Sequence, residues 1–224
     1  MPTSGTTDFT LTLGNLALLA FGRIGIRRAA ITQDHLQDFL LEANLMQAEW
    51  SADGINWWTV DQVTTPLVAG TATYSVPENV ISVLDVIINN NSTNRLIMPF
   101  SRTDYASLGD PTSQGFPTSY WYDRALEPTI VLWPVPDSST TYSMSYYVYT
   151  MTEDATFGNE TTPAVPYWWL DAYVAGMSHR LSRHWAPALE QIRGADALRS
   201  YQTACKQVEP APIYVTPGLS GYYR

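Results

Sequence analysis

The chain has 224 residues, a net charge of -9 and a charged share of only 15%, against about 25% in an ordinary globular protein. Its apolar share of 45% excludes a disordered chain, and a single cysteine, Cys205, excludes an internal disulfide framework or a four-cysteine zinc site. The acidic balance, with Lys206 as the one lysine, argues against DNA binding through phosphate neutralisation, which requires clustered Lys and Arg.

The N-terminal quarter is predicted to be helical. Residues 8–24 should form a mainly apolar first helix. Its most apolar stretch, 11–21, lacks the preceding basic residues of a signal peptide and is too short to span a membrane, so we expect a soluble, intracellular protein. A second helix should begin after Thr32, a common N-cap residue type, and reach Trp50. We expect its apolar residues to share one face that needs a packing partner: Leu36, Phe39, Leu40, Ala43, Met46 and Trp50.

The middle of the chain changes period. Residues 53–166 hold ten of the fifteen prolines, and they contain runs of β-branched and aromatic residues separated by turn residues. In the last run, Tyr142, Met144, Tyr146 and Val148 should share one face of a strand. One helical turn is predicted at 104–108, and the expected strands are 57–64, 71–76, 80–89, 95–99, 119–124, 129–133 and 142–150.

Helix is predicted to return after Pro166. A third helix should bury Leu170, Tyr173, Val174, Met177 and Leu181, and Pro187 should open a fourth. The predicted apolar face of the fourth helix consists of Leu189, Ile192, Leu198, Tyr201, Cys205 and Val208.

These patterns predict an α+β protein with three parts. Both chain ends, 1–52 and 167–208, should form one helical bundle, with an antiparallel β domain at 53–166 inserted between them and an extended tail at 209–224. The β insert contains 12 acidic and 3 basic residues, and the remainder contains 9 of each. The whole net charge of -9 therefore belongs to the β insert.

No residue pattern indicates catalysis, a cofactor or a metal. His179 and His184 are five residues apart and would point about 140° apart on one helix, while His35 belongs to another element. Glu153 and Asp154 are sequence neighbours whose side chains should diverge. We therefore predict a protein without enzymatic activity.

Three adjacent aromatic pairs, at 57–58, 121–122 and 168–169, have several interpretations. Neighbouring residues in a strand face opposite sides, so Trp57 and Trp58 could not both enter one core layer if they lay in a strand. The second ring could belong to another packed layer or to a surface between subunits, where Trp and Tyr are enriched. A carbohydrate-binding platform is a weaker third interpretation.

Four sequence blocks follow one another along the chain: 101–105 (SRTDY), 115–124 (GFPTSYWYDR), 132–137 (LWPVPD) and 163–181. In these blocks and their order, residues 85–215 resemble the tail tubular protein A and head-to-tail adaptor proteins of short-tailed bacteriophages. The resemblance implies a structural virion protein of the tail, assembled in the host cytoplasm. The helical part would dock on the portal protein, and the β part would face the tail nozzle protein. The copies, usually twelve, would form a ring that lines the DNA exit channel.

This resemblance suggests roles for particular residues. Asp104, Asp110 and Asp123 are candidates to line the channel, where double-stranded DNA would pass without specific binding. The candidate interface residues are Trp57, Trp58, Trp121, Trp168, Tyr214, Tyr222 and Tyr223. The alternative function is a tail-associated host-surface or carbohydrate-binding module that uses Trp57, Trp58, Trp121 and Tyr122 as stacking faces.

Overall fold

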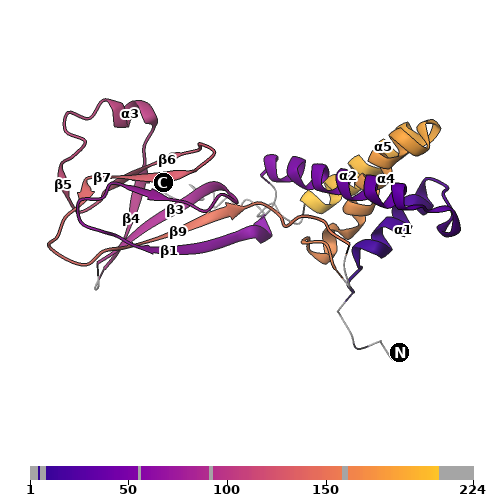
Figure 1. Ribbon diagram of the computed structural model, residues 1–224, viewed down its shortest axis with the longest axis horizontal. Coiled ribbons are helices and arrows are strands. Elements are labelled where there is room, and N and C mark those ends of the chain that lie inside the picture. Colours follow the sequence, from indigo (N-terminus) through magenta and orange to yellow (C-terminus); the bar gives the residue numbers. More distant parts are fainter. Residues whose placement is uncertain (1–4, 6–8, 55–56, 91–92, 158–160, 207–224) are drawn as a thin grey trace, which may run out of the picture. The chain divides into compact units, whose positions relative to one another are not determined.

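The computed structural model describes residues 5, 9–54, 57–90, 93–157 and 161–206. The chain divides into two compact units (Figure 1). The helical unit consists of Met1–Ala43 and Ala155–Arg224, and the β unit is Asn44–Asp154. The α+β class predicted from the sequence is confirmed. The predicted tail, 209–224, lies outside the described residues.

The helical unit is built around α4 (Leu170–Trp185), which packs against both α1 (Leu13–Arg23) and α5 (Glu190–Cys205). The apolar face predicted for α4 is confirmed, because all five of its residues are buried. Short 3₁₀ turns precede three of the helices: η1 (Arg28–Ala30), η3 (Tyr167–Trp169) and η4 (Pro187–Leu189).

Small side chains let α1 and α4 approach closely. Ala17 and Ala20 of α1 are fully buried, as is Ser178 of α4. The hydroxyl of Ser178 donates to the carbonyl oxygen of Val174 at 2.6 Å and points to that of Ala20 at 3.4 Å. These bonds satisfy a polar group that would otherwise be costly to bury.

Helix α2 (Gln33–Ala52) begins where the sequence predicts. Nδ1 of His35 accepts from the backbone N–H of Thr32 at 3.2 Å and lies 2.6 Å from its hydroxyl, so His35 takes the place of the acidic residue in a capping box. The helix is less one-sided than expected. Phe39, Ala43, Met46 and Trp50 are buried, but Leu41 and Leu45 on another face are 66% and 59% exposed.

The packing face predicted for α5 is only partly correct: Tyr201 packs edge-on against the buried Trp169 at 5.7 Å, but other members of the face are exposed. Ile192 and Leu198 are 56% and 59% exposed, and Cys205 is partly exposed. Gly194 instead lies against His179 of α4, and Ala204 is buried. The side of α5 that packs against α4 contains small residues. Because small residues contribute little to a pattern of large apolar side chains, the pattern did not predict this face. Val208 lies outside the described residues.

The β unit is a curled seven-stranded sheet with the order β1-β9-β3-β4-β6-β7-β2. The six residues 67–72 join its two edge strands, so the sheet wraps around one core. The strands are β1 (Val60–Pro66), β2 (Thr73–Ser75), β3 (Val80–Asn89), β4 (Asn94–Pro99), β6 (Ser119–Asp123), β7 (Thr129–Trp133) and β9 (Ser143–Thr150). The predicted inward face of the last strand is confirmed, because Tyr142, Met144, Tyr146 and Val148 are all buried.

The predicted antiparallel sheet is only partly correct. β4 and β6 are parallel, with Met98 opposite Ser119. The connection between them carries the short helix α3 (Arg102–Ala106), and a crossover of this kind is what parallel pairing requires. A separate parallel pair, β5 (Gln114–Gly115) and β8 (Val135–Pro136), was not predicted, because two residues are too few to show a period.

The strand predicted at 57–64 begins three residues late. Trp57–Thr59 forms a 3₁₀ turn, η2, and β1 starts at Val60. The expectation that Trp57 and Trp58 face opposite sides of a strand therefore fails. The side chain of Trp57 lies outside the described part of the structure, and Trp58 is partly buried.

Candidate interaction surfaces

Asp104, a predicted channel residue, caps its own helix. Its Oδ2 accepts from the backbone N–H and the hydroxyl of Ser101 at 3.0 and 2.7 Å, and the Ser101 hydroxyl accepts from the Asp104 N–H at 3.1 Å. These bonds form a capping box at α3. The hydrogen bonds from Ser101 lower the pKa of Asp104, so its charge is retained to lower pH.

Asp110 has a similar local role. Its Oδ1 accepts from the N–H and the hydroxyl of Thr112 at 3.0 and 2.7 Å, and these bonds lower its pKa. Its backbone carbonyl oxygen accepts from Nε1 of Trp133 at 3.1 Å.

The three predicted channel acids do not form a single cluster. Asp110 contacts Trp133 at one end of the β6–β7 pair, where Trp133 faces Ser119. Asp123 lies opposite Thr129 at the other end of the pair. It is four residues along β6 from Ser119, which corresponds to about 13 Å of extended strand. The structure therefore distributes these charges along the length of the two strands.

The β unit contains 12 acidic and 3 basic residues, so its net charge is -9, while the helical unit contains 9 of each. Two of the three bases contact aromatic rings. Arg95 lies over Phe116 at 5.4 Å, and Arg124 lies over Tyr122 at 5.9 Å while donating to the hydroxyl of Ser82 at 3.3 Å. The net charge is therefore -9 both for the predicted insert, 53–166, and for the observed β unit, 44–154.

Trp121 belongs to a second packed layer, one of the interpretations proposed from the sequence. Its ring lies 5.5 Å from that of Tyr105 in α3, and Tyr105 lies 6.0 Å from Phe100. The α3 segment therefore covers part of the outer face of β6, and Trp121 is only partly exposed.

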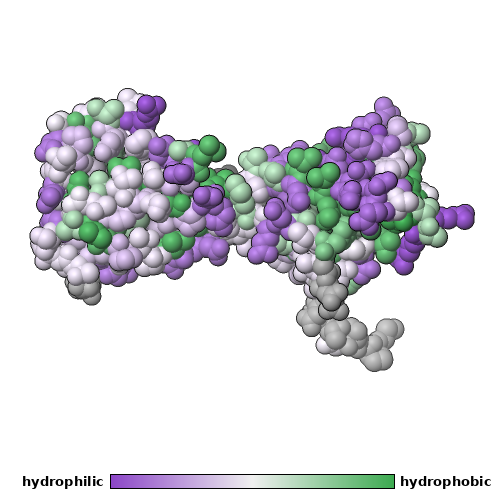
Figure 2. Space-filling model, in the orientation of Figure 1, coloured by the Kyte–Doolittle hydropathy of each residue, from purple (hydrophilic) through white to green (hydrophobic). Residues whose placement is uncertain are grey.

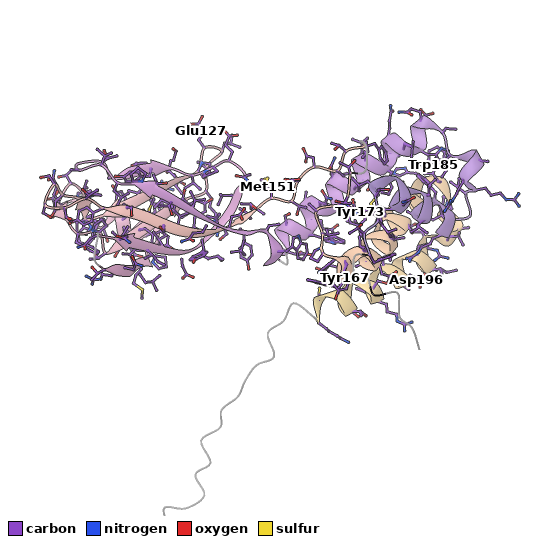
Figure 3. All side chains as sticks on the ribbon, turned by 90° about the horizontal axis from the view of Figure 1, so that it is seen from below. Glu127, Met151, Tyr167, Tyr173, Trp185 and Asp196 are labelled. Carbon is purple, nitrogen blue, oxygen red and sulfur yellow. The ribbon has the colours of Figure 1, made fainter. Side chains whose placement is uncertain are left out.

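Trp168 is more accessible and borders a cavity of about 370 Å³ in the helical unit. It is 40% exposed and packs edge-on against Tyr167 at 5.0 Å. Asp171 in the same cavity accepts from Arg23 and Ser200, each at 2.8 Å, and the Arg23 guanidinium is the main cause of its lowered pKa. Asp196, labelled in Figure 3, also lines this cavity.

A second cavity, of about 290 Å³, was not predicted. It lies in the β unit between the last turns of α2, the start of β3 and the residues that follow β9. Its lining includes Ala48, Ala52, Ile81, Met151 and Asp154. The sequence contains a pattern that could have indicated this surface. A second apolar stripe on α2 follows an i, i+4, i+7, i+11 spacing and consists of Leu41, Leu45, Ala48 and Ala52.

The remaining predicted interface residues, Tyr214, Tyr222 and Tyr223, lie outside the described residues. Within the described ranges, no three His, Cys, Asp or Glu side chains are placed to hold a metal ion. No helix in those ranges is both long enough and apolar enough to cross a membrane. The visible face of the β unit in Figure 2 is mostly pale or purple, with scattered hydrophobic residues.

The family model of the SU10 adaptor protein matches residues 12–214, from the N-cap of α1 into the C-terminal segment. The chain belongs to the SU10 adaptor protein family. This confirms the resemblance to phage head-to-tail adaptors, which was drawn from residues 85–215, and extends it through the first two helices. No curated protein matches the chain. The protein is thus a structural bacteriophage protein and a component of the virion.

Proposed function

We propose that this adaptor-family protein forms a ring that joins the portal protein to the tail nozzle protein and lines the DNA exit channel. Family membership supports an adaptor role. The observation that carries the channel role is the division of charge, with -9 on the β unit and zero on the helical unit. DNA carries one negative charge per about 1.7 Å of its axis, so an acidic channel wall repels it.

The two units suit different partners. In this proposal the helices, predicted as 1–52 and 167–208, form a bundle that docks on the portal, where zero net charge avoids long-range repulsion. The β domain, predicted as 53–166, faces the nozzle, and the tail at 209–224 attaches the subunit to a neighbour or to the portal. We propose twelve copies in the ring, as the resemblance implies.

An assembly experiment tests this function. Purified adaptor should co-sediment with portal rings, and the mass of the complex should give the number of bound copies. The adaptor alone can be monomeric without contradicting the proposal, since the portal supplies the template. Failure to bind the portal would overturn it.

A further inference from the structure

The cavity next to the end of α2 is lined by apolar and polar side chains, which include the acidic Asp154. Ala48, Ala52, Ile81 and Met151 supply apolar lining, and Met151, labelled in Figure 3, is 56% exposed. Asp154 lines the cavity and Glu153 precedes it; both are exposed, and neither has a side-chain partner among the described residues. We call this surface the acidic groove.

The loop before α2 has the opposite charge. Arg27 and Arg28 are exposed, and neither guanidinium has a hydrogen-bond or ion-pair partner among the described residues. The loop is ordered by its own backbone: Gly25 adopts a φ of +90°, the Ile26 N–H donates to Phe21 at 3.0 Å, and the Ala30 N–H donates to Arg27 at 2.8 Å. Two cations and the exposed alanines 29 and 30 therefore occupy a preformed surface, here called the basic loop.

The basic loop belongs to the helical unit, and the acidic groove belongs to the β unit. They differ in charge and in shape, one being a projecting turn and the other a hollow. A ring requires two different surfaces on each subunit, which meet head to tail. Opposite charge would also speed and orient their encounter.

We propose that the basic loop of one adaptor copy docks on the acidic groove of the next copy, with Arg27 and Arg28 facing Glu153 and Asp154. This contact rests on the proposed ring and identifies the two surfaces that close it. Alanine side chains of the loop would meet the apolar side chains of Ala52 and Met151. The portal is the competing partner for the loop, and the experiment separates the two.

The first experiment is cross-linking on portal rings in a Cys205→Ser background, which removes the one native thiol. Ala29→Cys and Ala52→Cys replace exposed residues in the loop and the groove. Mixing the two single variants and adding a short bis-maleimide should give covalent dimers, and the double variant should give a ladder of multimers. Each single variant alone should stay monomeric on a denaturing gel.

The second experiment reverses charge. Arg27→Glu with Arg28→Glu, and separately Glu153→Arg with Asp154→Arg, should each lower ring occupancy on the portal at least about tenfold. Mixing the two variants should restore it, because each loop then meets a groove of opposite charge. Arg102→Glu, at an exposed arginine of α3, is a matched control expected to have no effect. Unchanged melting temperatures would confirm that every variant folds.

The outcomes separate the contact from the ring. Normal ring occupancy without cross-links, or without mutual rescue, would overturn the loop-to-groove contact and leave the adaptor function standing. Occupancy lost by the loop variant and not restored by mixing would assign the loop to the portal. Failure of the wild-type adaptor to bind portal rings would overturn the proposed function itself.

Discussion

Asp171 shows how one residue can join several helices. It lies in the first turn of α4, and its carboxylate accepts from Arg23 of α1 and from Ser200 of α5. Sequence periodicity cannot predict this link, because Asp171 and Arg23 are 148 residues apart. Asp104 and Asp110 are more local: their partners are two or three residues away in patterns typical of caps and turns.

Replacing Asp171 by Asn should reduce stability in a pH-dependent way. The pKa of Asp171 is lower in the folded protein, so its contribution is present above the unfolded pKa near 4 and is lost as the pH falls through the folded pKa. Because the side chain is 68% exposed, we expect about 1 kcal/mol or less. Melting temperatures from pH 7 to pH 3 should show the wild-type advantage shrinking below about pH 4.

The control for this prediction is Asp61→Asn. Asp61 is exposed in β1 and has no side-chain partner among the described residues, so its replacement should leave stability nearly unchanged at every pH. An Asp171→Asn variant with the same deficit at pH 3 as at pH 7 would show that the loss comes from packing rather than from the charge.

At the scale of elements, close approach of helices decides which faces are buried. A Cβ atom on Gly194 of α5 would lie 3.2 Å from Nε2 of His179, so α4 and α5 meet where α5 lacks a side chain. Counting apolar residues placed Ile192 and Leu198 in the core, but both are exposed. Small residues can mark a packing face as clearly as large apolar ones.

Gly194→Leu should therefore separate α4 from α5 and lower the free energy of unfolding by about 1 to 3 kcal/mol, the usual cost of overpacking. Gly22→Ala in α1 is the matched control, because a Cβ there meets nothing within 4 Å. It should be neutral or stabilising by up to about 1 kcal/mol, since alanine favours helix. Urea unfolding measures both, and equal stability of the two variants would contradict the close packing.

At the scale of the whole molecule, charge is the property that distinguishes the two units. The β unit bears -9 and the helical unit is neutral, although each has its own buried core. Sequence counting alone located this asymmetry, because charge depends on composition and not on packing. Which face of the β unit bears the acids depends on how its strands pair.

Neutralising Asp104, Asp110 and Asp123 to Asn should slow genome release, because a less acidic wall repels the duplex less. Asparagine keeps an acceptor oxygen for the local hydrogen bonds that Ser101 and Thr112 donate. The effect should fade at high salt, where the Debye length falls to about 3 Å at 1 M. DNA release from purified particles is the measurement, with Asp34→Asn in the helical unit as control. Unchanged kinetics at low salt would argue against a channel role.

The sequence by itself determined the α+β class, most strand and helix positions, the inward face of β9 and the location of the charge. These follow from local periodicity, turn residues and composition, which act over a few residues. Only the tertiary structure decided the parallel pairing of β4 with β6, the packing face of α5, the layer over Trp121 and the groove beside α2. Each of these depends on segments distant in sequence, and a side-chain period shows which face is apolar but not what covers it.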